Sequence, residues 1–286
     1  MLRLILLIIL FMIMAFTLVA NIASKQTGRP GVDPMNEVNR MVRKTFGGAD
    51  RLAPDLGEAI DRVDAQLSKL GKGNGGEETP TDIKANLNLS AANFTGAEAA
   101  NAVFAGVEIN ATQFTGALLD GASFEGATGA GAKFAKARMK GADLSAAKLP
   151  GADFTGADLN EAALRAGDFS GADFSGANLT GASFSAAALS KAVIAKAFAP
   201  GGQFVDATAD GADFSNTDLR AARFGGASLK DATFAGADVA GADFAGAHLQ
   251  GADLSGAKGL TSQQIASACG DASTKLPHGL SLPACE

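Results

Sequence analysis

The feature that most constrains the fold is an apolar residue that returns at every fifth position from Leu87 to Ala257, without insertion or deletion. Segments such as GADFTGADLNEAAL show the unit: Ala, a polar residue, Phe or Leu, and two small or polar residues. We call the Phe or Leu position the centre, and the 34 centres run in steps of five from Leu89 to Leu254. A period of five fits neither a helix nor an ordinary strand, so the array predicts a coil with flat sides.

Two positions of each unit are predicted to face inward. Thirty of the 34 centres are Phe, Leu, Ile, Val or Met, and 28 of the 34 positions two residues earlier are Ala, which suits a narrow core. A Gly recurs two residues after the centre, where a corner can require a positive φ. Pro150-Gly151 and Pro200-Gly201 place the residue order of a type II turn at the same corner.

The Phe residues add a second period, of ten. Fourteen of the 18 Phe are centres, and 13 of these are in phase at multiples of ten residues, whereas Phe169 is the exception. Phe and Leu sides should therefore alternate, which requires an even number of sides per coil. The predicted core ladder consists of Phe94, Phe104, Phe114, Phe124, Phe134, Phe154, Phe174, Phe184, Phe204, Phe214, Phe224, Phe234 and Phe244.

The array, with its consensus A-(D/N)-L-x-x and Leu or Phe at the centre, resembles the pentapeptide-repeat family. The resemblance implies an all-β solenoid over residues 85–260, a right-handed quadrilateral β-helix with four units per coil. It also implies two stacks of Phe rings on opposite sides: one of Phe94, Phe114, Phe134, Phe154 and Phe174, the other of Phe184, Phe204, Phe224 and Phe244. Gly129, Ala199 and Ala209 should then leave thin spots in the core.

Residues 1–24 are interpreted as a membrane anchor. Leu4 to Ala23 is a run of twenty residues without a charge, which as a helix matches the bilayer core of roughly 30 Å. A cleaved signal peptide is the alternative, but the small-x-small cleavage pattern is poor. We expect a single-pass transmembrane helix in a bacterial inner membrane with the rod in the periplasm. Flanking charges leave the orientation open, because Arg3 precedes the segment and Lys25 and Arg29 follow it.

Residues 25–84 are predicted to contain two short helices and a Gly-rich linker. The first helix begins at Asp33 and Pro34, and the second runs from about Pro54 to Gly71. Apolar residues in the second helix alternate spacings of four and three, as in a two-heptad seam. This seam within residues 55–70 either packs on the neighbouring helix or the first coil, or mediates self-association. It consists of Leu56, Ile60, Val63, Leu67 and Leu70.

Residues 261–286 are predicted to cap the last coil. Thr261 and Gln264 form a T-x-x-Q capping box for a short helix that would end at Cys269 and Gly270. Both cysteines of the chain, Cys269 and Cys285, lie in this tail. A pair confined to one cap favours a disulfide in an oxidising compartment, and two unrelated thiols are the alternative.

Nothing in the sequence predicts a catalytic residue, a metal ligand set or a cofactor. The inward positions hold no Asp, Glu, Lys, Arg or His, and the two histidines, His248 and His278, lie on the outer face of the rod and in the tail. No metal-ligand spacing or Gly-rich phosphate loop occurs. Ten Asp residues stand directly before a centre, where they should point to solvent and provide solubility.

These features favour a non-catalytic, membrane-anchored scaffold that presents a rigid rod to a protein partner, as in an accessory subunit of a membrane complex. Candidate contact residues are Phe198 and a basic cluster, with ordinary surface variation as the alternative. The cluster consists of Lys133, Lys136, Arg138 and Lys140. The array holds 18 acidic and 12 basic residues, which argues against direct nucleic-acid binding. The family resemblance implies a second hypothesis, DNA mimicry that binds and protects a topoisomerase such as gyrase.

Overall fold

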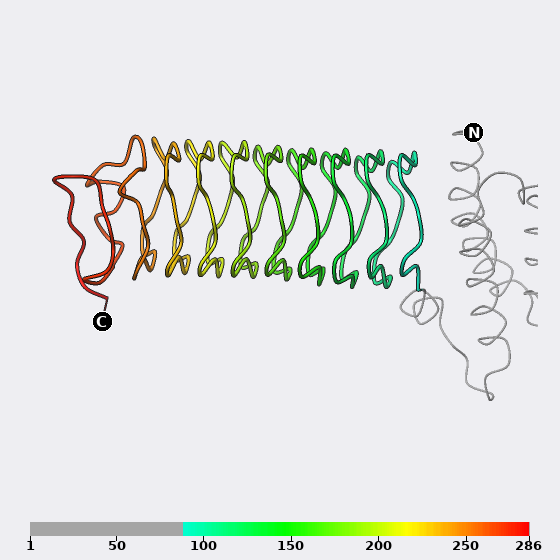
Figure 1. Ribbon diagram of the computed structural model, residues 1–286, viewed down its shortest axis with the longest axis horizontal. Helices are drawn as coiled ribbons and strands as arrows, with labels where there is room; N and C mark the ends of the chain where they lie inside the picture. The colour runs from blue at the N-terminus through cyan, green and yellow to red at the C-terminus, as the bar shows by residue number, and fades with distance from the viewer. Residues whose placement is uncertain (1–87, 286) are drawn as a thin grey trace, which may run out of the picture.

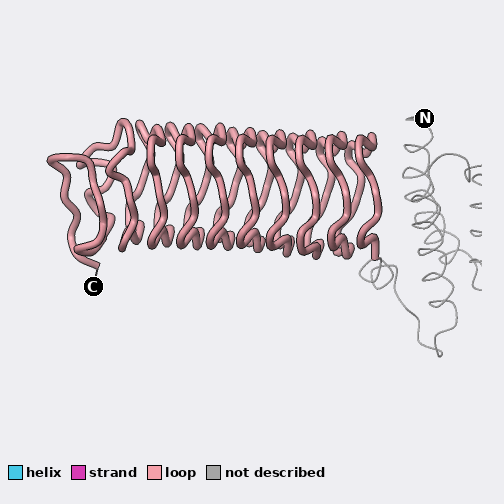
Figure 2. The backbone as a smooth tube through the Cα atoms, viewed as in Figure 1, coloured by secondary structure: helices cyan, strands magenta, loops and turns pink. Residues whose placement is uncertain are grey.

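The computed structural model describes residues 88–285, which form a straight rod of stacked coils closed at the C-terminal end by an irregular cap (Figure 1). Within this range there is no helix, and extended backbone occurs only as single bridge residues between turns (Figure 2). None of the described segments is a helix long and apolar enough to cross a membrane. The predicted anchor and the predicted helices of residues 25–84 lie outside the described residues.

Each coil of the rod contains four five-residue units. Asn88 forms a parallel bridge with Glu108, Asn93 with Gln113, and the same offset of twenty continues along the array. Backbone hydrogen bonds join the coils, as where the Leu89 N–H donates to the Glu108 carbonyl oxygen at 2.7 Å. At roughly 4.8 Å between stacked strands, the 34 units span about 40 Å. The four-sided coil implied by the family resemblance is confirmed.

We number the four sides by their first bridge residue. The first side begins at Asn88, the second at Asn93, the third at Glu98 and the fourth at Val103, and each continues in steps of twenty. The bridge residue of every unit faces outward, whereas the centre after it and the residue before it face the core.

The corners have the predicted backbone conformation. All 33 residues that stand two positions after a centre, from Ala91 to Gly251, have a positive φ, and 14 of them are not Gly. Gly151 has a φ of 63°. The Ala152 N–H donates to the Leu149 carbonyl oxygen at 3.2 Å across Pro150, as a type II turn requires.

Stacked Phe rings line the second and fourth sides of the core. On the second side, Phe134 and Phe154 stack with ring centroids 4.9 Å apart, and on the fourth side Phe204 and Phe224 do the same at 4.9 Å. Rings from opposite sides meet edge to face, as Phe124 and Phe134 do at 5.3 Å and 90°. The core is therefore two aromatic columns that interlock along the rod axis.

At two positions where Gly replaces the usual apolar residue of the repeat, a neighbouring side chain occupies the space. A Cβ on Gly167 would lie 2.5 Å from Cε2 of Phe169, so the missing methyl group makes room for the one Phe that is out of phase. A Cβ on Gly129 would lie 2.5 Å from Cγ1 of Ile109. The expected thin spot at Gly129 is thus occupied by Ile109.

Asp and Asn residues before the centres stabilise the corners. All thirteen of them accept a hydrogen bond from the backbone N–H two residues later, as Asp143 does from Ser145 at 2.9 Å and Asp173 from Ser175 at 2.8 Å. These N–H groups lie in the turns and have no partner in the bridges between coils. The side chains are therefore turn-stabilising groups as well as solubilising ones.

The predicted short helix after Thr261 is wrong: residues 262–267 form turns. The Phe244 N–H donates to the Gln264 carbonyl oxygen (3.3 Å), and the Gly246 N–H to the Ser267 carbonyl oxygen (3.1 Å). The Gln264 carbonyl group, which a helix would use internally, is thus bound by the last coil. Ile265 is buried against the core, so this segment still covers the end of the rod.

Candidate functional site

The third side carries the most exposed aromatic ring among the described residues. Phe198 occupies a bridge position between Asn178 and Asp218, so its side chain points outward and is 47% exposed. The other large exposed apolar residue in the described range, Val103, lies on the fourth side at the first coil (49%). Because Phe198 lies well inside the rod, no end effect explains its exposure.

Two of the predicted basic residues lie on the same side as Phe198. Arg138 is in its column of bridge residues, three coils and about 14 Å away, and Lys140 follows in the same unit. Lys133 lies on the second side, and Lys136 is the corner residue between the two sides, with a φ of 57°. The structure therefore places Arg138, Lys140 and Phe198 on one surface and leaves Lys133 off it.

Acidic neighbours neutralise most of the basic cluster. Arg138 Nε lies 2.6 Å from an Asp120 carboxylate oxygen, Lys140 Nζ lies 3.4 Å from Asp158, and Lys133 Nζ lies 3.9 Å from Asp153. Exposed ion pairs of this kind contribute at most about 1 kcal/mol to stability. A charged group of a binding partner can therefore take the place of one member at little cost in free energy.

A charged pair also borders Phe198. The Arg220 guanidinium donates two hydrogen bonds to Asp218, at 2.9 and 2.7 Å, and these bonds lower the pKa of the Asp218 carboxyl. Asp218 is the bridge neighbour of Phe198. We define the third-side patch as Arg138, Lys140, Phe198 and Arg220 with their acidic partners, an exposed ring on a surface of mixed charge.

The third side as a whole bears six acidic and four basic side chains between residues 88 and 258. The acidic ones are Glu98, Asp120, Asp158, Glu161, Asp218 and Asp238, and the basic ones are Arg138, Lys140, Arg220 and Lys258. No side of the described coils is a continuous acidic surface of the kind that duplex DNA presents.

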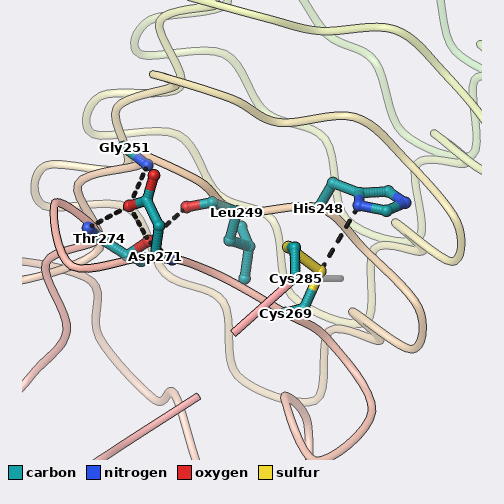
Figure 3. The surroundings of a disulfide bond; sticks show 7 residues. All are labelled: His248, Leu249, Gly251, Cys269, Asp271, Thr274 and Cys285. Atoms are coloured by element: carbon teal, nitrogen blue, oxygen red, sulfur yellow. Dashed lines mark hydrogen bonds between the residues drawn. A yellow bond between two sulfur atoms is a disulfide. The ribbon is translucent and has the colours of Figure 1, made fainter. Parts of the chain in front are cut away.

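The C-terminal cap is held by a disulfide and by a network around Asp271 (Figure 3). Cys269 and Cys285 are joined, with their Cα atoms 4.8 Å apart. Hydrogen bonds from the Ser273 hydroxyl and the Gly251 N–H lower the pKa of Asp271 to about 2. The Thr274 hydroxyl donates to the Leu249 carbonyl oxygen at 2.8 Å, which ties the tail to the last coil.

The interior of the described rod offers no site for chemistry. Three polar residues are buried in the described range: Thr112 and Thr217 at inward positions, and Ser183 at a bridge position, where its hydroxyl oxygen accepts from Arg165 Nε at 3.2 Å. No charged side chain is buried between residues 88 and 285. The Thr112 and Thr217 hydroxyls are used by the fold, since they donate to the Leu89 and Ile194 carbonyl oxygens at 2.8 and 2.6 Å. Nothing in this part of the chain points to an enzymatic activity.

One cluster was not anticipated from the sequence. His248 Nδ1 lies 3.5 Å from Cys269 Sγ, and the ligand atoms of His248, Cys269 and Cys285 all lie within 4.8 Å of one another. The separation of 21 residues between His248 and Cys269 departs from the period of twenty, so the repeat alone does not predict their contact. His278 lies apart from this cluster, in the tail.

The comparison with the solved structure of HetL supports this architecture. HetL, a pentapeptide repeat protein involved in heterocyst differentiation regulation from the cyanobacterium Nostoc sp. strain PCC 7120, is 26% identical with a TM-score of 0.56, covering 59% of this chain and 79% of that one. QnrB1, a plasmid-mediated fluoroquinolone resistance protein, is 18% identical with a TM-score of 0.35, covering 65% and 92%. A pentapeptide repeat protein from the Arabidopsis thaliana thylakoid lumen is 32% identical with a TM-score of 0.20, covering 39% and 74%.

The family model for pentapeptide repeats matches eight overlapping times, from residue 88 to residue 258, while no curated protein matches the chain. The matched range coincides with the coils of the rod and ends where the cap begins. On this match and the four-sided coil, the chain belongs to the pentapeptide repeat family.

Proposed function

We propose that this protein is a non-catalytic scaffold, held at a membrane by residues 1–24, that binds a protein partner through the third-side patch. The exposure of Phe198 in the middle of a rigid rod is the observation that carries the proposal. The anchor rests on the uncharged run from Leu4 to Ala23. With the rod in the periplasm, the partner is a protein of that compartment or the outer part of a membrane complex.

The composition of the patch fits a protein-binding surface. Aromatic and Arg side chains are enriched where binding energy concentrates, and polar groups surround them. Phe198 supplies the ring, while Arg138 and Arg220 supply guanidinium groups whose exposed ion pairs are easily exchanged. Because the coil backbone is hydrogen-bonded to the neighbouring coils, the backbone positions of these residues are fixed before binding.

The test is cross-linking and co-purification from native membranes with the full-length chain. Phe198→Ser should remove the cross-linked partner, and a double Arg138→Ser, Lys140→Ser variant should weaken its capture. Val103→Ser is the matched control, since it removes an equally exposed apolar side chain from the fourth side. Equal capture by the Phe198→Ser variant and the unmodified chain would overturn the third-side patch.

The location of the rod has a separate test. A membrane-impermeant thiol reagent applied to intact cells should label Cys269 and Cys285 only after reduction, because both thiols are joined in the disulfide. Labelling that needs lysis but no reductant would place the rod in the cytoplasm and remove the periplasmic part of the proposal.

The second hypothesis, topoisomerase binding by DNA mimicry, is weaker. The net excess of acid in the array favours it, but basic residues interrupt all four sides of the described coils. We expect no change in a gyrase supercoiling assay at any concentration of the chain. Inhibition or protection in that assay would instead make gyrase the partner.

A further inference from the structure

The tail brings His248 and both cysteines together through backbone contacts as well as through the disulfide. Cys269 continues the first side as an extra strand position: it forms a parallel bridge with His248, its N–H donates to the Ala247 carbonyl oxygen (3.0 Å), and its carbonyl oxygen accepts from Leu249 N–H (2.8 Å). Neighbouring side chains on one face of such a ladder point the same way. His248 and Cys269 are therefore held side by side by the coil itself.

Cys285 is also placed by the backbone. Its N–H donates to the Gly270 carbonyl oxygen at 2.9 Å, the Gly270 N–H donates to the Pro283 carbonyl oxygen at 2.9 Å, and Gly270 forms a bridge with Ala284. Asp271, which follows Gly270, accepts a hydrogen bond from the Gly251 N–H and so fixes the turn that leads toward Cys285 (Figure 3). None of these contacts involves a sulfur atom.

We infer that the cap, once its disulfide is reduced, binds a zinc ion through His248 Nδ1, Cys269 Sγ and Cys285 Sγ. In a tetrahedral site with Zn–S near 2.3 Å and Zn–N near 2.05 Å, a sulfur and a nitrogen ligand are about 3.6 Å apart and two sulfur ligands about 3.8 Å apart. His248 Nδ1 already lies 3.5 Å from Cys269 Sγ. The second distance requires rotation about the Cα–Cβ bond of one or both cysteines, whose Cα atoms lie 4.8 Å apart.

The ligand set suits zinc. Two thiolates and one imidazole are a zinc-binding combination, and the fourth position is left to water. His248 is exposed and the two cysteines are half-buried, so the ion can enter without unfolding of the coils. The oxidised and metal-bound cap are mutually exclusive states of the same three side chains, which makes zinc binding dependent on the redox state.

The reaction balances with a phosphine as the reductant. The phosphine takes up the oxygen of one water molecule and becomes its oxide, the sulfur–sulfur bond breaks, and each sulfur receives one proton. Zinc binding then releases the two thiol protons, and it requires that His248 Nδ1 carry no proton.

The test is zinc titration of the full-length chain, purified in detergent without metal, before and after treatment with a phosphine. The reduced chain should bind one zinc ion and the oxidised chain none, with Co²⁺ as a spectroscopic probe for thiolate ligation. His248→Ala and Cys285→Ser should each weaken zinc binding at least about tenfold. His278→Ala is the matched control and should bind as the unmodified chain does.

Three outcomes would overturn the inference. These are no zinc binding by the reduced chain, equal affinity in the His248→Ala variant, and equal loss of affinity in the His278→Ala variant. Far-ultraviolet circular dichroism of the reduced chain shows whether the coils persist, and loss of the coils on reduction would contradict the claim that the backbone holds the site.

Discussion

The two ends of the described rod are closed to different degrees. At the first coil, Leu89, Phe94 and Phe104 keep exposed fractions of 6, 7 and 5%, whereas at the last coil Phe244 and Leu249 are fully buried. At the last coil the irregular cap closes the rod (Figure 1). Two cap residues, Ile265 and Ala268, join the buried core there. A repeat solenoid therefore needs non-repeating residues to complete its core.

The largest difference should appear when a ring is removed from each region. Phe224 stacks on Phe204 and Phe244 at 4.9 and 5.0 Å, so Phe224→Ala should lower the free energy of unfolding by about 3–5 kcal/mol. Among the described residues Phe94 has a single stacked neighbour, Phe114, and Phe94→Ala should cost less. Urea unfolding followed by far-ultraviolet circular dichroism measures both, since the chain has no Trp or Tyr for fluorescence. Equal costs would mean that the first coil is as tightly covered as the last.

The disulfide should account for the next largest effect, confined to the C-terminal end. It closes a loop with a sequence separation of 16, and its removal in Cys285→Ser should cost about 3 kcal/mol in the cap. Hydrogen exchange should show loss of protection in residues 261–285 and little change near Phe94. A reductant should reproduce this pattern in the unmodified chain and leave the variant unaffected. Equal loss of protection at both ends would show that the cap does not act locally.

A single amide group also holds the cap to the last coil. Gln264 Nε2 donates to the Val239 and Ala242 carbonyl oxygens at 2.6 and 2.9 Å, and its Oε1 accepts from the Thr261 N–H. Gln264→Ala should lower the free energy of unfolding by about 1–3 kcal/mol, because the Val239 and Ala242 carbonyl groups lose their hydrogen-bond donor. Gln263→Ala, at the exposed neighbouring position, is the control in the same urea experiment and should be neutral. A neutral Gln264→Ala would show that water replaces the amide.

The smallest effect should be a pH dependence of the cap. The pKa of Asp271 in the folded chain is about 2, below its ordinary value, because the Ser273 hydroxyl and the Gly251 N–H bind the carboxylate. The Asp271 carboxylate therefore contributes fully to the free energy of unfolding of the cap above about pH 4, and this contribution is lost as the pH falls toward 2. Hydrogen exchange of the Gly251 amide at the two pH values measures it. Asp271→Asn should remove the pH dependence, and an unchanged profile would assign it to another carboxylate.

The regular part of the molecule could be predicted from the sequence because every unit repeats the same packing problem. The period of five and the phase of Phe predicted the corners and the alternation of Phe and Leu sides, and the family resemblance set the number of sides at four. The partnership of Phe169 with Gly167 also has a sequence signal, since an out-of-phase Phe follows a missing Ala by two residues. Each of these features depends on positions a fixed distance apart.

The cap and the third-side patch were less predictable because they break the repeat. Thr261 and Gln264 have the spacing of a capping box, but the last coil binds the Gln264 carbonyl group that a helix would need. The contact between His248 and Cys269 depends on an extra residue in the turn between them. Arg138 and Phe198 share a side only because their separation of sixty residues is a multiple of twenty, which becomes visible once the number of sides is known.

Because each coil has four sides, the number of residues between two positions determines the angle between the directions in which their side chains point. Five inserted residues would preserve the inward pattern yet turn every later side by a quarter of a revolution, and would bring Phe rings against the Leu columns. Ten would restore the alternation of Phe and Leu but face Phe198 away from Arg138. Twenty would leave all directions unchanged and add about 4.8 Å to the rod. Whole-coil duplications are thus the length changes that preserve the direction of every outward group. They lengthen the rod without rotating the later residues about its axis.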